Sequence, residues 1–429
     1  MNFSRCAVQR GQQKLGLMGL IIDKGDTAWL LISTILVMMM TTPGLALFYG
    51  GLVRAKNMLS ILTQVLGITA AVILTWVAWG YSLAFAPGGA IVGGLGKAFL
   101  AGIGPDSAIP TFSKGIGIPE LAFVAFQMTF AAITASLIIG ALAERVRFTA
   151  LLVFTVLWIT LVYAPIAHMV WSPDGLIFKL GALDFAGGTV VHVNAGIAGL
   201  AGVFIAGKRI GFLKEAMPPH SLALTLVGAG LLWVGWFGFN AGSALEANGS
   251  AAVAMMNTFI APAAGALAWL SAERIVSGKP SALGGASGAV SGLVAITPAA
   301  GTSGFAAGAC LGAVAALACY AFVGSLKNRL RLDDSLDAFG IHGIGGIIGS
   351  IGTALVSAPA IGGFMGADYD AVAQLWIQAA AVLIAGGWSA IGSTFCFWLT
   401  GKLVPLRTDR DSEREGLDLT DHGERAYNY

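Results

Sequence analysis

Residues 184–192 read Asp184-Phe-Ala-Gly-Gly-Thr-Val-Val-His192, and this stretch opens an apolar run that continues to about residue 206. A second stretch, Asp337-Ala-Phe-Gly-Ile-His342, opens another apolar run. The two histidines occupy comparable places in the two halves of the chain. Ionisable groups are expensive inside a bilayer, so such a pair indicates a solute path or a proton relay. The arrangement predicts a pore or carrier with an internal repeat.

The composition is that of a membrane protein. Of the 429 residues, 56% are hydrophobic and only 11% are charged, whereas soluble domains average about 25% charged residues. The surface is therefore expected to face a lipid bilayer, where the 60 glycines allow close helix packing. A net charge of +2 gives no reason to expect nucleic acid as a partner. The four cysteines show neither metal-ligand spacing nor a disulfide framework.

The hydrophobic runs predict an all-α membrane protein. A helix needs about 20 apolar residues to cross a bilayer, and this rule picks out about eleven segments. A helix satisfies all of its own backbone hydrogen bonds, which a lipid-exposed segment requires. The expected spans are 27–50, 59–86, 119–142, 149–171, 187–206, 221–243, 251–272, 283–300, 304–325, 337–358 and 372–400.

Basic residues gather in every second loop, and this pattern predicts the orientation. The positive-inside rule places basic loops in the cytoplasm, so the N-terminus is expected outside and the C-terminus inside. An odd number of spans requires the two ends to lie on opposite sides, in agreement with the charges. The basic loops and the tail carry Arg54, Lys56, Arg145, Arg147, Lys208, Arg209, Lys214, Arg274, Lys279, Lys327, Arg329, Arg331, Lys402 and Arg407.

The chain divides into three parts on these criteria. Residues 1–26 form a segment of uncertain role, because a basic stretch before a short apolar run is typical of a weak signal peptide or of a start codon placed too far upstream. Residues 27–401 form the membrane domain. Residues 402–429 form a charged cytoplasmic tail that could not bury a core alone, and we expect it to dock on helix ends or on a partner.

The histidines have two interpretations. An imidazole can donate from one nitrogen and accept at the other, and two rings in contact titrate as a pair. His192 and His342 could thus guide a small neutral polar solute through an apolar channel. Alternatively, each could make an ordinary hydrogen bond between helices. Their matched positions in the two halves favour the pore.

The two aspartates are interpreted differently. Asp184 begins a helix and is expected to cap the free amides of its first turn, while its charge would also favour a cation near the outer mouth. Asp337 lies near the inner end of its segment, and we expect it to have a structural capping role.

Aromatic residues suggest a cation site. Phe126 and Phe130 are four residues apart and share a helix face, and Trp171 ends a span at the predicted outer surface. Such aromatics could belong to the interfacial belt of a membrane protein. Together with the Ser243 hydroxyl they could instead form a cage, because a desolvated cation gains about 2 kcal/mol or more over aromatic faces. No nucleotide, zinc or nucleophile motif is present, so no catalytic residue, metal or cofactor is expected.

Several motifs in order resemble those of the ammonium transporter (Amt/Mep/Rh) family, most closely its bacterial ammonium channels. The resemblance covers the chain from about residue 27 to the end. It rests on Pro43-Gly-Leu-Ala-Leu-Phe-Tyr-Gly-Gly-Leu-Val-Arg54, Gly140-Ala-Leu-Ala-Glu-Arg145, Asp184 to His192, Gly235-Trp-Phe-Gly-Phe-Asn-Ala-Gly-Ser243, Phe339-Gly-Ile-His-Gly343, Glu415-Gly-Leu-Asp418 and His422-Gly-Glu424.

The resemblance implies a homotrimer in the cell membrane, with one pore per subunit. The first ten helices would form two inverted five-helix repeats around that pore, followed by an eleventh helix. It implies transport of ammonium or ammonia, with methylammonium as an analogue, and regulation by a PII signalling protein at the tail. It assigns Phe126, Phe130, Trp171 and Ser243 to an outer ammonium site with Asp184 below it, Phe130 and Phe239 to a gate near Trp236, and His192 and His342 to the pore.

Three other functions are considered. A gas channel for ammonia or carbon dioxide would not be expected to carry Trp171 and this type of tail. An ammonium sensor without significant flux would usually carry an added signalling domain. A membrane enzyme could use the two histidines as acid and base, but no nucleophile or metal cluster accompanies them.

Overall fold

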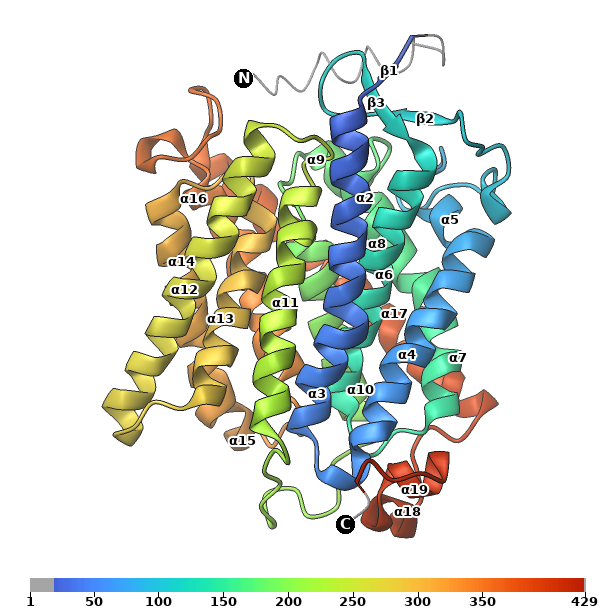
Figure 1. Ribbon diagram of the computed structural model, residues 1–429, viewed down its shortest axis with the longest axis vertical. Coiled ribbons are helices and arrows are strands. Elements are labelled where there is room, and N and C mark those ends of the chain that lie inside the picture. Colours follow the sequence, from blue (N-terminus) through green and yellow to red (C-terminus); the bar gives the residue numbers. More distant parts are fainter. Residues whose placement is uncertain (1–18, 428–429) are drawn as a thin grey trace.

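Long apolar helices that run from one end of the molecule to the other make up most of the structure (Figure 1). The computed structural model describes residues 19–427. Within these residues, 11 helical segments are long and apolar enough to cross a membrane. The prediction of an all-α membrane protein with eleven spans is thereby confirmed. The predicted boundaries are close to the observed ones, as in the span predicted at 187–206 and found at Gly188–Ala206.

The first five spans form one half of the molecule, and all of them except α6 are built from consecutive helical pieces. α6 packs against α2, α4 and α10, and α4 packs against α7. The pieces of these spans are α2 (Lys24–Met39), η1 (Met40–Leu45) and α3 (Ala46–Leu52); α4 (Met58–Thr75), η3 (Trp76–Gly80) and α5 (Tyr81–Phe85); α6 (Glu120–Leu142); α7 (Phe148–Trp158), η5 (Ile159–Tyr163), α8 (Ala164–Trp171) and, after a short turn, α9 (Leu176–Leu180); η6 (Gly188–Val193) and α10 (Asn194–Ala206).

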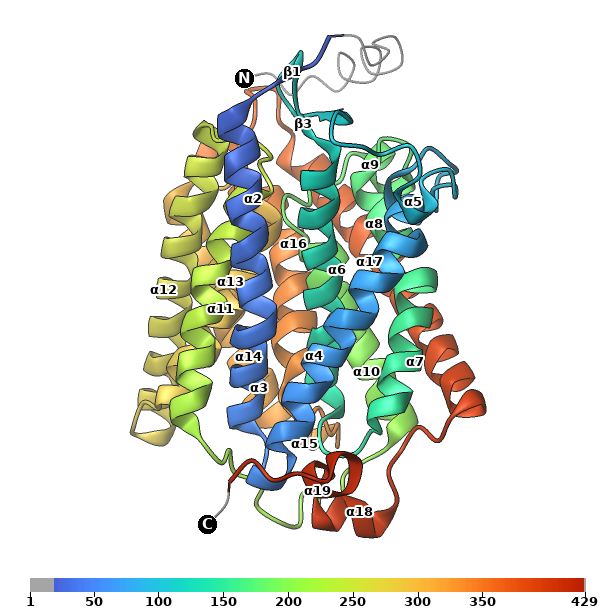
Figure 2. The same cartoon turned by 45° about the vertical axis from the view of Figure 1, so that its right-hand side comes forward.

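The next five spans form the second half, which lies beside the first (Figure 2). α12 packs against α13 and α14, and α13 and α14 pack against α16. The halves meet where α11 packs on α2, where α10 contacts η9 and where α16 contacts η6. These spans are α11 (Leu222–Gly242), α12 (Gly249–Ser277), α13 (Ala282–Ile296) with η7 (Thr297–Ala299), α14 (Phe305–Ala321) with η8 (Phe322–Leu326) and α15 (Lys327–Arg329), and η9 (Phe339–Gly343) with α16 (Ile344–Val356).

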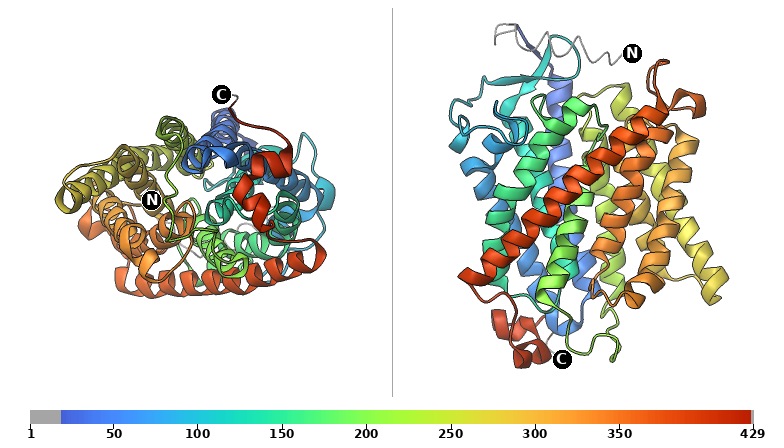
Figure 3. Two further views of the ribbon diagram at one scale, coloured as in Figure 1. Left: turned by 90° about the horizontal axis from the view of Figure 1, so that it is seen from below. Right: turned by 180° about the vertical axis from the view of Figure 1, so that it is seen from behind.

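The eleventh span, α17 (Ala371–Leu403), crosses the back of the bundle diagonally (Figure 3). It packs against α7 and α10 of the first half and α16 of the second, so it ties the two halves together. Two short helices follow it, α18 (Arg410–Glu415) and α19 (Leu417–His422). We call the end of the bundle where they lie the tail end.

A small sheet lies at the opposite end, which we call the strand end (Figure 1). β1 (Ile21–Ile22) pairs in parallel with β3 (Ile116–Pro119), which pairs in antiparallel fashion with β2 (Ala108–Pro110). No pattern in the sequence predicts this sheet. The first helix also begins earlier than residue 27, because Asp23 caps it and accepts a hydrogen bond from the Asp26 amide at 2.9 Å. Residues 19–26 thus fold onto the bundle, whereas residues 1–18, which carry most of the possible signal segment, lie outside the described residues.

The degree of burial separates inner helices from peripheral ones. In the most apolar stretch of α6, 89% of the residues are buried inside the protein, against 39% in the corresponding stretches of α12 and α17. A helix that is apolar all round is expected to be surrounded by protein. α6 is therefore the central helix of the first half, and two of the aromatic residues predicted to form the cation site, Phe126 and Phe130, lie on it.

Candidate functional site

Three aromatic rings converge towards the strand end. The ring centroids of Phe126 and Phe130, both on α6, lie 4.9 Å apart, and Phe130 lies 5.9 Å from Trp171 at the end of α8. Gly242, next to Ser243 in sequence, packs so closely that a Cβ placed on it would lie 3.0 Å from the Phe126 ring. The structure thus brings together the three rings that the sequence suggested as part of a cage, and it places Gly242, the neighbour of Ser243, against the Phe126 ring.

Ser243 holds its hydroxyl in a defined direction. Its Oγ donates to the Phe239 carbonyl at 2.8 Å. The oxygen lone pairs therefore remain able to accept a hydrogen bond from a solute. Because ring faces attract cations and a hydroxyl accepts from N–H groups, this arrangement suits a small cation that carries protons.

A stacked pair of buried rings lies next to this cage. The centroids of Phe130 and Phe239 lie 4.0 Å apart with an angle of 14° between their planes, and both side chains are buried. Trp236, one turn from Phe239 on α11, lies 5.8 Å from it. The Trp236 indole N–H donates to Thr297 Oγ1 at 2.9 Å, which holds the indole in place. The sequence offered no reason to select Thr297.

The two histidines meet beyond this stacked pair. His192 on η6 and His342 on η9 face each other with 3.2 Å between their Nδ1 atoms and 5.2 Å between ring centroids. His192 also stacks on Trp236 at 5.4 Å and lies 6.0 Å from Phe239. Ring contacts therefore follow one another without a break from Trp171 to His342.

The histidine contact has a definite chemical meaning. Of the two Nδ1 atoms one must donate and the other accept, so the rings share a proton. This contact is also a hydrogen bond between helices of the two halves, as the alternative interpretation predicts. The contact does not use every polar atom of the pair, because His192 Nε2 is buried without a hydrogen-bond partner in the part of the chain that the structure describes. A buried polar atom without a partner is costly unless something binds it.

Two glycines allow the helices of the histidines to cross in direct contact. Gly196 and Gly346 each lie four residues after a histidine. A Cβ on Gly196 would fall under 3.0 Å from the Gly343 Cα, and a Cβ on Gly346 would lie 3.0 Å from the His192 Cβ. Sequence analysis missed these residues, although the equal four-residue offset in both halves was a visible signal.

Asp184 caps its helix as predicted. Its two carboxylate oxygens accept hydrogen bonds at 2.6–3.1 Å from the amides of four consecutive residues, 187–190. Its own carbonyl oxygen accepts from the Trp171 indole at 3.0 Å. Gly187 has φ +104°, a left-handed conformation that favours glycine. Since main-chain amides occupy the carboxylate, Asp184 can act on a cation through its field and by positioning Trp171.

The capping role expected for Asp337 is wrong. Its backbone is left-handed (φ 60°), and its carboxylate forms an ion pair with Lys327 instead of meeting the amides of η9. The residue that accepts from η9 is Asp334, whose Oδ2 receives the Gly340 amide at 3.0 Å. The turn before η9 places the earlier carboxylate next to the helix start, which sequence spacing alone did not reveal.

A buried ion network holds the tail end of both halves. Arg54 pairs with Glu144 at 2.8 Å, and Arg209 pairs with Glu144 at 3.1 Å and with Asp333 at 2.8 Å. Burial alone would raise the pKa of Glu144, but the hydrogen bonds and charges of Arg54 and Arg209 hold it below its usual value. The sequence showed these arginines only as an orientation signal, yet they also fix the elements at the tail end of the bundle.

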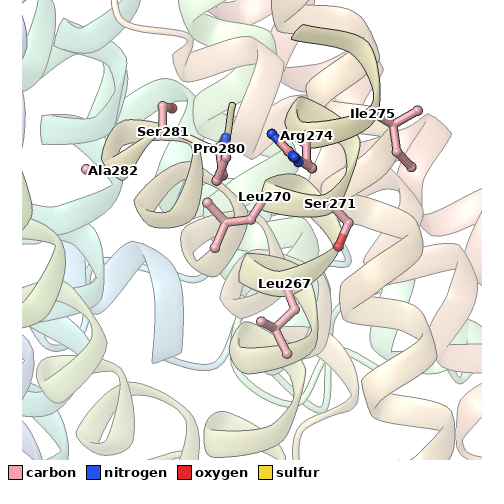
Figure 4. Close-up of a pocket in the computed structure, with 8 residues that line it drawn as sticks. All are labelled: Leu267, Leu270, Ser271, Arg274, Ile275, Pro280, Ser281 and Ala282. Atoms are coloured by element: carbon pink, nitrogen blue, oxygen red, sulfur yellow. The ribbon is translucent and has the colours of Figure 1, made fainter. Parts of the chain in front are cut away.

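A separate surface hollow has no part in this path. A cavity of about 630 Å³ lies between the end of α12 and the start of α13, lined by residues such as Leu267, Leu270, Arg274 and Ile275 (Figure 4). Ile275 is 82% exposed, so the hollow opens on the outside of the bundle. Among residues 19–427 no group of three His, Cys, Asp or Glu side chains could hold a metal ion.

Comparisons with known proteins agree with this arrangement of residues. A family described as the Ammonium Transporter Family matches residues 28–427. The chain is similar to the ammonium transporter of Bacillus subtilis, with 46% identity over 95% of this chain and 99% of that protein. It is similar to the ammonium transporter of Aquifex aeolicus, with 45% identity over 95% and 94%. The crystal structure of Saccharomyces cerevisiae Mep2 superposes with a TM-score of 0.81 and 35% identity, covering 91% of this chain and 88% of that one.

Proposed function

This chain belongs to the ammonium transporter family, and from that membership we propose a mechanism for its own residues. Family membership makes it a multi-pass membrane transport protein for ammonium and not an enzyme. The mechanism has three stages: recruitment of NH4+ at the cage, loss of a proton at the stacked rings, and conduction of NH3 past the histidines.

Recruitment takes place at Phe126, Phe130, Trp171 and Ser243. The ring faces attract the cation, and the Ser243 oxygen accepts one of its N–H groups. Asp184 adds a negative charge close by without coordinating the cation, because its oxygens are occupied by amides. Methylammonium, which keeps three N–H groups, is expected to bind as an analogue.

Selectivity arises at the stacked rings of Phe130 and Phe239. A charged species that leaves the cage enters a dry, apolar path, and the loss of hydration there raises its free energy. Ammonium can avoid the penalty by giving a proton to water on the cage side of the rings, whereas potassium has no proton to lose. For transport to carry net charge, that proton must then cross separately from the ammonia. A neutral ammonia molecule could then pass the ring pair when side-chain motion separates it.

The observation that carries this proposal is the contact series that ends at the histidine pair. Ammonia can donate a hydrogen bond to a ring nitrogen or accept one from it. His192 Nε2 is buried without a partner within the described residues, so it is available to a passing solute. His192 and His342 would thus replace part of the hydration that ammonia loses.

The test measures current from liposomes on a solid-supported membrane, with pulses of ammonium, methylammonium or potassium. Wild-type protein is expected to pass current with ammonium but not potassium. Asp184→Ala should abolish the ammonium current, whereas Asp370→Ala, which removes a capping aspartate at the start of α17, should not. Replacing His192 and His342 together by leucine should abolish ammonium selectivity, and unchanged selectivity in that variant would refute the pore role. If wild type passes no current, an internal pH dye tells neutral ammonia conduction from the absence of flux.

The oligomeric state, the orientation in the membrane and the regulatory partner are proposed on the basis of the same family membership. We expect a homotrimer with one pore per subunit, in the cell membrane. The basic residues Arg54, Arg145, Arg147 and Arg209 lie at the tail end, which supports a cytoplasmic tail end and an outward-facing strand end. A PII protein is expected to bind the tail end, and addition of the PII protein of the same organism should then reduce the ammonium current.

A further inference from the structure

A second cavity lies where the loop after α10 meets the beginning of the tail. It has a volume of about 630 Å³ and lies at the tail end, away from the ring contacts of the pore. Its lining joins residues 208–215 to residues 407–410. Half of the lining residues are cationic, namely Lys208, Arg209, Lys214, Arg407 and Arg410.

Only two of these five cations are neutralised by partners. Arg209 pairs with Glu144 and Asp333, and Arg407 pairs with Glu413 at 2.8 Å. The other three side chains are exposed and form no ion pair among residues 19–427. These three are Lys208, Lys214 and Arg410.

Two carboxylates also line the cavity but do not balance these charges. Asp409 is engaged by Arg147 at 3.7 Å and by the Ser412 amide at 2.9 Å. Glu215 folds back over Gly211, where a Cβ would lie 2.7 Å from its Oε2. Three free cations therefore face one free carboxylate, so the unpaired side chains carry a net positive charge.

We propose that this cavity binds a small anion that carries two or more phosphate groups. Excess positive charge of this size calls for a ligand with at least two negative charges, and Lys and Arg side chains are the usual binders of phosphate. The volume lies within the range of about 300–1,000 Å³ that is common for small-molecule sites. The same chemistry belongs to a soluble diphosphate and to the headgroup of a phosphorylated lipid.

Binding there would tighten the docking of the tail. Lys208 and Lys214 come from the loop, and Arg410 opens α18, so one anion would join both segments. Two hydrogen bonds already join the loop to the tail. The Ile210 amide donates to Glu413 at 2.6 Å, and Arg407 Nη2 donates to the Lys208 carbonyl at 2.7 Å. The cavity is thus a ligand site that couples the tail to the loop between α10 and α11.

The experiment is calorimetric titration of the purified full-length protein with pyrophosphate. Wild type should show saturable binding, and exchange of backbone amide hydrogens in residues 207–215 and 407–416 should slow. The Lys208→Gln/Lys214→Gln variant should bind at least about tenfold more weakly, a loss of about 1.4 kcal/mol. The control Lys279→Gln/Lys402→Gln removes the same charge from exposed lysines elsewhere and should bind as wild type does.

A second titration separates the two sources of phosphate. Vesicles of phosphatidylcholine are compared with vesicles that also contain phosphatidylinositol bisphosphate. Retention on the phosphorylated vesicles, lost in Lys208→Gln/Lys214→Gln, identifies a lipid headgroup, and pyrophosphate binding alone identifies a soluble anion. The proposal is overturned if neither probe binds saturably, or if both double variants bind equally.

Discussion

Two glycines determine how closely the histidine rings approach each other. Gly196 on α10 lies directly against the backbone of η9, Gly346 on α16 lies directly against η6, and each glycine follows its histidine by four residues. The 3.2 Å contact between the two Nδ1 atoms depends on that crossing. At this scale, residues outside the series of ring contacts control how closely the two histidines approach each other.

Gly196→Ala is therefore expected to damage both stability and transport. The added Cβ would fall under 3.0 Å from the Gly343 main chain, which cannot move as a side-chain end can. Overpacking of this kind costs about 1–3 kcal/mol, and separation of the helices should break the histidine contact. Thermal unfolding in detergent and ammonium flux in liposomes measure the two effects.

The matched control is Gly230→Ala on α11, where no atom lies within 4 Å of the added Cβ. It should transport like wild type and could gain up to about 1 kcal/mol from the better helix propensity of alanine. Normal flux in Gly196→Ala would contradict the proposed role of the crossing.

Asp334 should make stability depend on pH. Burial, followed by repulsion from Asp337, raises the pKa of Asp334 from 3.8 to about 6. The folded state thus binds this proton more tightly than the unfolded chain does, and stability is lost as pH rises from about 4 through about 6. The difference between the two pKa values corresponds to about 3 kcal/mol.

Asp334→Asn, which cannot ionise, should remove this pH dependence. The asparagine oxygen can still accept the Gly340 amide. The free energy of unfolding of the variant, relative to that of wild type, should increase between about pH 4 and pH 6 and stay constant above about pH 6. Melting temperatures across this range, with the exposed Asp368→Asn as control, test the expectation. A difference between variant and wild type that does not change with pH would refute it.

At the scale of elements, both histidines lie on π-helical turns. His192 belongs to η6 and His342 to η9. A π-turn adds a residue to the helix and is frequent at functional sites, because it redirects side chains and frees backbone groups. The chain therefore departs from regular α-helix in the same way in both halves, at the residues that meet.

The sequence predicted the spans better than these irregular pieces. Spans depend on local composition and on the requirement for internal backbone hydrogen bonds in lipid. The turn geometry before η9 depends on tertiary contacts, so sequence spacing predicts Asp337 as the cap although Asp334 accepts the Gly340 amide. The pairing of β1 with β3 likewise joins residues about 95 positions apart and has no local signal.

Gly416 is expected to control the docking of α19. It has φ +117°, and a Cβ on it would lie 2.6 Å from the Lys56 carbonyl. Gly416→Ala should thus displace the tail and break the hydrogen bond from the Leu417 amide to Asn57 at 2.9 Å. Faster tryptic cleavage after Arg414 would reveal the displacement.

Gly401→Ala serves as its control, because no atom lies within 4 Å of the added Cβ. This glycine lies near the end of α17, before the tail. Equal cleavage rates in the two variants would show that Gly416 is not required for docking.

For the whole molecule, the histidine pair of the proposed pore arises from pairing the two halves. His192 and His342 lie 150 residues apart in sequence and come into contact only when the halves pack together. The internal repeat was visible in the sequence because the two motifs match. The contact distances, the glycine crossing and the ion network of Glu144 were not, since each depends on packing between segments that only the folded chain brings together.

One chain supplies every residue of the ring contacts from Trp171 to His342. In the proposed trimer the three pores should therefore work independently. When wild-type subunits are mixed with the His192→Leu/His342→Leu variant before reconstitution, selective ammonium flux should fall in direct proportion to the fraction of wild-type subunits. Native mass spectrometry gives the composition of the mixed trimers. A steeper fall would mean that one defective subunit impairs its neighbours, and the pore would then need more than one chain.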